Sequence, residues 1–108
     1  MLFNFSKNVF DLSGNMLLDQ SGPVTFKRVA ILALLENGQI SVEDKYKRFK
    51  LAQKMESGPD VIDVNIDEIK ELKDRVESFG STLVVGRFNE FINSPIQIVE
   101  TVSSGEVG

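Results

Sequence analysis

The sequence contains no cysteine, no histidine and no tryptophan, and it has a single tyrosine. Without cysteine and histidine the chain has no disulfide, no zinc site built from these ligands, no thiol nucleophile and no catalytic triad with a histidine base. Because other aromatic residues are so few, the eight phenylalanines have to supply most of any aromatic core. The remaining function classes are those that need neither thiol nor imidazole chemistry.

Long hydrophobic runs are absent too. The longest, Val29–Leu35, is much shorter than the ~20 apolar residues that span a bilayer, and the first residues lack the pattern of a signal peptide. We therefore expect no membrane association and a cytoplasmic location. The length of 108 residues, with 42% hydrophobic and 26% charged residues, fits one globular domain, which we place at residues 1–93.

Charge is distributed unevenly along the chain. The net charge is −4, but residues 1–55 carry eight basic and five acidic side chains, whereas residues 56–108 carry four and eleven. Such a split is typical of a protein with two partners or a polar assembly, and equally of helices whose wet faces differ in charge.

The N-terminal segment predicts a β-hairpin. Apolar residues alternate at Phe3 and Phe5 and again at Phe10 and Leu12, and the chain has a turn signal around Gly14, where glycine tolerates positive φ. An isolated hairpin is marginal in water, so this one has to pack on another element.

Four helices are predicted, over residues 26–37, 42–57, 66–79 and 82–93. Thr25, Ser41 and Asn65 are placed to cap the first three, because their side-chain oxygens accept free first-turn N–H groups, and Glu68 completes a capping box. Val29–Leu35 is apolar on every side, which predicts that the first helix is the buried centre of the fold. The ends of these three helices are predicted at Asn37-Gly38, Gly58-Pro59 and Gly80.

The third helix has a single-sided apolar stripe. Its members follow the helical spacing and are Ile66, Ile69, Leu72, Val76 and Phe79. In the fourth helix, Gly86 predicts a point of close packing against a neighbour, since glycine costs about 1 kcal/mol relative to alanine there. Taken together, the patterns predict an α+β fold in which an N-terminal β-hairpin packs on a bundle of about four short helices. Residues 94–108 form a tail, with an edge strand at Ile96–Val102 followed by a frayed end.

The second helix contains a basic run, with five Lys or Arg side chains between residues 45 and 54. On a helical wheel Val42, Tyr46 and Phe49 fall together and predict the buried side, while Lys47, Lys50 and Lys54 form a neighbouring stripe. Glu43–Lys47 and Asp44–Arg48 have the spacing of stabilising i,i+4 pairs. Three interpretations remain: a solvated helix face, a protein-binding surface at Lys47, Lys50 and Lys54, or a nucleic-acid surface. The acidic net charge and the inward prediction for both aromatics disfavour nucleic acid.

Two motifs with catalytic or metal-binding associations fit poorly. Asp63, Asn65 and Asp67 have the spacing of a calcium loop, but Glu68 occupies the position that needs glycine. The stretch from Gly80 to Arg87 resembles a phosphate loop without its lysine and hydroxyl. We therefore predict no catalytic residue, no metal and no cofactor.

The order of motifs resembles a group of small proteins encoded by tailed bacteriophages and prophages. The motifs are "FDLSGNML", "VTFKRVAILALL", "SVEDKYKRFKLAQKM", "VNIDEIKELKDRV" and "STLVVGRFNEFIN", and they cover about residues 3–93. Arg87 departs from the polar uncharged residue usual after the glycine, and the tail beyond Asn93 has no counterpart. No activity, cofactor or catalytic residue is associated with the group.

The resemblance implies a phage origin and an accessory role. The sequence therefore predicts a non-enzymatic protein in the cytoplasm of a bacterial host that binds an unknown phage or host protein, as a virion or tail assembly factor or a host-protein binder. The alternative is a nucleic-acid-associated regulator that uses the basic helix at residues 45–54, through Lys45, Lys47, Arg48, Lys50 and Lys54.

Overall fold

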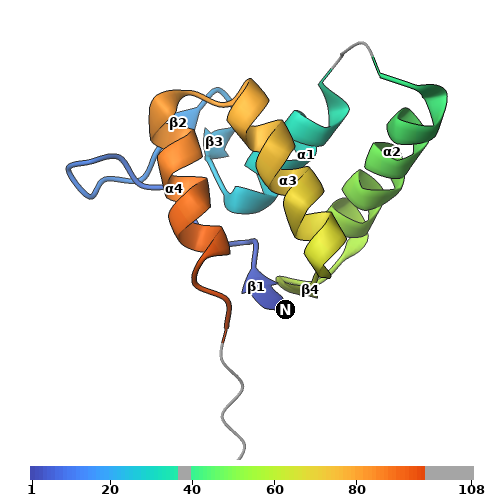
Figure 1. Ribbon diagram of the computed structural model, residues 1–108. Coiled ribbons are helices and arrows are strands. Elements are labelled where there is room, and N and C mark those ends of the chain that lie inside the picture. Colours follow the sequence, from blue (N-terminus) through green and yellow to red (C-terminus); the bar gives the residue numbers. More distant parts are fainter. Residues whose placement is uncertain (37–39, 97–108) are drawn as a thin grey trace, which may run out of the picture.

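The structure, a computed structural model, describes residues 1–36 and 40–96. In these residues it has four helices and two small antiparallel sheets of two strands each, which confirms the α+β class. The elements in chain order are β1 (Leu2–Asn4), β2 (Leu18–Asp19), β3 (Gly22–Pro23), α1 (Phe26–Leu35), α2 (Val42–Ser57), β4 (Val61–Asp63), α3 (Ile66–Phe79) and α4 (Thr82–Ile92). Figure 1 shows α2 and α4 on opposite sides of the molecule, with α1 and α3 between them.

The first strand does not belong to an N-terminal hairpin, and that prediction is wrong. β1 pairs with β4, with Phe3 opposite Ile62, so the strand's partner lies more than fifty residues away. The chain does reverse near Gly14, which has φ +87°, but the flanking pairing is a single bridge between Phe10 and Met16. Sequence alternation identified the extended segment correctly, but nothing in a local pattern specifies a distant partner.

A second, tighter reversal joins β2 to β3. Gly22 has φ +115° and lies opposite Asp19 in the antiparallel register. The Asp19 carboxylate accepts the Ser21 N–H at 2.8 Å and binds Nε of Arg28 at 2.6 Å. These bonds lower the pKa of Asp19 below its ordinary value of 3.8, the backbone N–H of Ser21 having the larger effect. The turn is thereby tied to the first turns of α1.

The predicted helix starts are confirmed. Thr25, Ser41 and Asn65 cap α1, α2 and α3, and each side-chain oxygen accepts a backbone N–H of the first turn. Glu68 returns the contact to the Asn65 backbone N–H, so the capping box is complete. The ends of α2 at Gly58 and of α3 at Gly80 agree as well. The predicted stop at Asn37-Gly38 lies outside the described residues.

Phenylalanine supplies the aromatic core, as its abundance predicts. Rings from β1, α1 and α4 meet in one cluster, with centroid separations between 4.2 and 6.2 Å; its members are Phe3, Phe5, Phe26, Phe88 and Phe91. The closest pair is Phe26 stacked on Phe91, with an interplanar angle of 6°. The cluster joins the start of the chain to its last helix.

The first helix is central but not buried all round. α1 packs against both α2 and α3, and α3 packs against α4. The buried side chains of α1 are Phe26, Val29, Ala30, Ala33 and Leu34, whereas Leu32 and Leu35 are 43% and 55% exposed. The prediction of a helix buried on every side is therefore wrong, because α2 and α3 cover only part of its circumference.

The segment that follows α4 returns to β1. Ile96 donates its backbone N–H to the carbonyl of Leu2 at 2.8 Å and forms a bridge with that residue. The remainder of the predicted edge strand, residues 97–102, lies outside the described residues. Of the helices that the structure describes, none combines the length and apolar character needed to cross a membrane.

Candidate functional site

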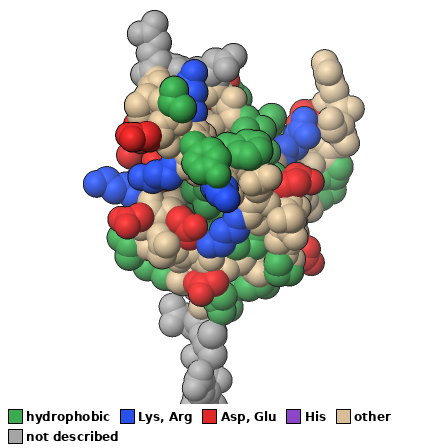
Figure 2. Space-filling view, turned by 90° about the vertical axis from the view of Figure 1, so that its right-hand side faces the viewer, with side chains coloured by type: hydrophobic (Ala, Val, Ile, Leu, Met, Phe, Trp, Pro, Cys, Tyr) green, Lys and Arg blue, Asp and Glu red, His purple; other side chains and the backbone are tan. Residues whose placement is uncertain are grey.

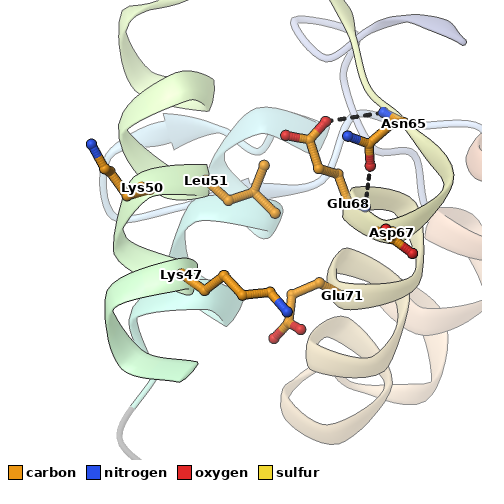
Figure 3. A pocket seen from close by; sticks show the side chains of 7 residues that line it. All are labelled: Lys47, Lys50, Leu51, Asn65, Asp67, Glu68 and Glu71. Atoms are coloured by element: carbon orange, nitrogen blue, oxygen red, sulfur yellow. Dashed lines mark hydrogen bonds between the residues drawn. The ribbon is translucent and has the colours of Figure 1, made fainter. Parts of the chain in front are cut away.

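The lysines predicted as a partner surface surround a cleft between α2 and α3. Lys47, Lys50 and Leu51 form the α2 wall of this hollow of about 290 Å³. The opposite wall comes from the first turns of α3, with Asn65, Asp67, Glu68 and Glu71 (Figure 3). The two helices both pack on α1, and the cleft separates them from each other.

Ion pairs bridge the cleft. Nε of Arg48 lies 2.6 Å from a carboxylate oxygen of Glu71, and Nζ of Lys54 lies 2.8 Å from one of Glu68. Both basic side chains therefore join α2 to α3. Within the described residues neither predicted i,i+4 contact, from Glu43 or from Asp44, is present as an ion pair.

The three predicted lysines thus have different surroundings. Lys54 forms an ion pair with Glu68. Lys47 reaches across the cleft toward Glu71, whereas Lys50 points away from it (Figure 3). The Lys50 ammonium lies 5.5 Å from the ring centroid of Tyr46, within the range of a cation–π contact. The three side chains do not form one open basic surface.

The calcium-like pattern has other partners in the structure. The Asp63 carboxylate binds the N-terminal ammonium of Met1 at 2.9 Å, and this hydrogen bond lowers the pKa of Asp63. Asn65 is the cap of α3. Among residues 1–36 and 40–96, no three carboxylates gather closely enough to hold a metal ion.

The side of α2 that faces away from the α2–α3 cleft is apolar and exposed to solvent. Val42, Tyr46 and Phe49, which we call the α2 outer stripe, are 81%, 61% and 48% exposed. The buried side chains of this helix are Leu51, Ala52 and Met55. The predicted buried side of α2 is therefore wrong. Figure 2, which faces the α2 side of the molecule, shows hydrophobic side chains near the centre of this face with charged ones around them.

A groove continues the outer stripe toward α1. Three adjoining hollows of about 180, 190 and 180 Å³ follow the junction of α1 and α2. Leu35 and Phe49 stand between two of them, and Ile31 lines two. The middle hollow of this α1–α2 groove is mainly apolar, whereas charged side chains contribute to the lining of the two outer hollows. Sequence reasoning missed it, because the prediction treated Leu32 and Phe49 as core residues.

A separate hollow lies between the loop around Gly14 and α4. Its volume is about 420 Å³, and its lining includes Leu12, Leu83 and Gly86. Arg87 holds the loop in place: its Nε and Nη2 atoms donate to the carbonyl oxygens of Phe10 and Asp11, both at 2.9 Å. Arg87 therefore has a structural role.

Gly86 does not mark a packing contact. A Cβ atom built on it meets nothing within 4 Å, so the prediction of close packing at this position is wrong.

The described residues thus form a charged cleft between α2 and α3, a groove of three hollows between α1 and α2, and a separate hollow beside α4. Comparisons with protein-family models, with curated proteins and with solved structures gave no match to this chain.

Proposed function

We propose that this chain is a non-enzymatic accessory protein of phage or prophage origin that acts through protein–protein contacts. It works in the cytoplasm of a bacterial host, as a virion or tail assembly factor or as a binder of a host protein. The phage origin rests on the motif resemblance over about residues 3–93. The interaction role rests on the α2 outer stripe, and this is the observation that carries the proposal.

Exposed aromatic side chains on a helix are well suited to anchor a partner. Tyr46 and Phe49 are 61% and 48% exposed although the same helix buries Leu51 and Met55. Burying apolar surface favours association, and tyrosine is among the residues that dominate interface energetics. The adjacent α1–α2 groove, with Leu35 on its wall, has the form that receives an amphipathic helix.

The proposed contact lies on the α2 outer stripe and not on the predicted lysine stripe. Lys54 is paired with Glu68 and so joins α2 to α3, and Lys47 faces the cleft. Lys50 remains at the border of the outer stripe, beside Tyr46. The proposed partner surface is therefore mainly apolar, with a basic border.

The test is affinity capture from bacteria that carry the phage or prophage encoding this chain, followed by mass spectrometry. The double variant Tyr46→Ser/Phe49→Ser should lose the captured phage or host protein while its circular dichroism stays native. Leu18→Ser is the matched control, because Leu18 is also exposed (64%) but lies in β2, and it should retain the partner. Equal capture by all three proteins would show that the outer stripe is not the docking surface.

One observation favours the nucleic-acid alternative. Tyr46 and Phe49 point outward beside Lys45 and Lys50, and aromatic rings between basic side chains are typical of single-strand binding. Two of the five basic residues are nevertheless neutralised by acids of α3, and the chain is acidic. A fluorescein-labelled single-stranded DNA at about 150 mM salt should therefore show no binding by anisotropy. Salt-sensitive binding that the double variant loses would favour the regulator.

A further inference from the structure

The charges that border the α2 outer stripe have a regular arrangement. Lys45 and Glu56, which are both exposed, lie on one border of the stripe. Glu43 and Lys54 lie on the other border. In both pairs the members are eleven residues apart, which is close to three helical turns, so each pair lies along one edge of the helix about 16 Å apart. The order is basic then acidic on one border and acidic then basic on the other. The midpoints of the two pairs fall on either side of Phe49.

This pattern is complementary to its own antiparallel copy. A two-fold axis beside Phe49 places Lys45 of one chain near Glu56 of the other, and this contact occurs twice. Glu43 comes near Lys54 of the other chain, which is already paired with Glu68 of its own chain. A parallel two-fold arrangement would instead place Lys45 near Glu43 and Glu56 near Lys54 of the other chain, and the mixture of charge variants described below separates the two orientations. The antiparallel arrangement has one unfavourable contact, because it brings Lys50 near Lys50 of the other chain. In the single chain the Lys50 ammonium lies over the Tyr46 ring.

We infer that the α2 outer stripe binds a second copy of this chain, with the two α2 helices antiparallel across a two-fold axis near Phe49. The inference rests on the proposed function, because it names one partner of the same surface. Within the described residues Glu43, Lys45 and Glu56 have no ion-pair partner in the single chain.

The apolar part of the contact extends beyond α2. Phe49 lies at the centre of the stripe and meets its own copy at the axis. Stable interfaces bury about 1,200 Å² or more in total, which is more than one pair of short helices covers. Leu35, which lines the same hollows as Phe49, and the neighbouring Leu32 extend the apolar surface along α1. Figure 2 shows this face unobstructed around its centre.

Sedimentation equilibrium on the full chain tests the inference. The average mass of the wild type should rise with concentration toward twice that of one chain. The Phe49→Ser variant should stay monomeric and keep a native circular dichroism spectrum. Lys45→Glu and Glu56→Lys should each weaken the dimer about tenfold, because each reverses two cross-chain contacts. Leu18→Ser is the control and should dimerise as wild type does.

Mixing the two charge variants gives the sharpest result. A heterodimer of Lys45→Glu with Glu56→Lys regains two favourable contacts, so native mass spectrometry of an equimolar mixture should show mainly mixed dimers. A wild type that stays monomeric, or a mixture without preference for the heterodimer, would overturn the inference. If the chain is monomeric but Tyr46→Ser/Phe49→Ser still loses a phage or host protein, the proposed function stands alone. A dimer that captures no other protein would leave the inference standing and remove the phage or host partner.

Discussion

Replacing Gly86 by alanine should stabilise the protein. Gly86 lies inside α4 and its φ is not positive, so alanine adopts this backbone without strain. A Cβ atom there meets nothing within 4 Å, so no steric cost opposes the higher helix propensity. The expected gain is about 1 kcal/mol, equivalent to a rise in Tm of about 4 °C for a domain of this size.

Gly58→Ala is the matched control with the opposite sign. A Cβ at Gly58 would lie 2.7 Å from the carbonyl oxygen of Lys54 and 3.1 Å from Cδ1 of Ile62. The variant should therefore melt below wild type, because the end of α2 has to shift. Thermal and urea unfolding followed by far-ultraviolet circular dichroism measure both variants. A Gly86→Ala protein less stable than wild type would refute the reasoning and restore a packing role for this residue.

Three further predictions concern the core, a cap and acid stability. Leu34→Ala should lower the free energy of unfolding by about 2–5 kcal/mol, whereas Leu32→Ala should lower it by only about 1 kcal/mol. The reason is that the Leu34 side chain is 3% exposed and that of Leu32 is 43% exposed. Urea titrations that rank the two variants in reverse would contradict the placement of α1. Asn65→Ala should cost about 1 kcal/mol by the same assay, because the capping box of α3 is lost, and an unchanged midpoint would move the helix start. The pKa of Asp19 is lowered in the folded state, so its contribution to stability is present above pH 3.8 and is lost as the pH falls through the folded pKa. Asp19→Asn should accordingly lose less stability than wild type between about pH 5 and pH 2, and equal losses would show that the turn does not depend on this charge.

Local signals in the sequence identified the helices and their starts. Thr25, Ser41 and Asn65 were recognisable because a cap depends on side chains within three residues of it. The orientation of α2 was not recognisable in this way. That helix has one apolar set at Val42, Tyr46 and Phe49 and another at Leu51, Ala52 and Met55, and only the position of α1 decides which set is buried.

The candidate site was partly predictable for the same reason. The basic run of α2 could be recognised, but its acids Glu68 and Glu71 lie on another helix, more than ten residues along the chain. Periodicity relates residues within an element, so it assigned the lysines to solvent and the outer stripe to the core. Likewise, the role of Arg87 depends on a loop more than seventy residues earlier.

The pairing of β1 with β4 has a consequence for how the protein is made. The ribosome delivers residues 2–4 well before their strand partner, residues 61–63, and Phe3 and Phe5 pack on Phe91 of α4. At about 5–20 residues per second, roughly 5–20 s pass between synthesis of the first phenylalanines and of the ring that completes their cluster. β1 is thus synthesised well before the elements that it packs against. During that interval its phenylalanines are accessible to the chaperones of the cell.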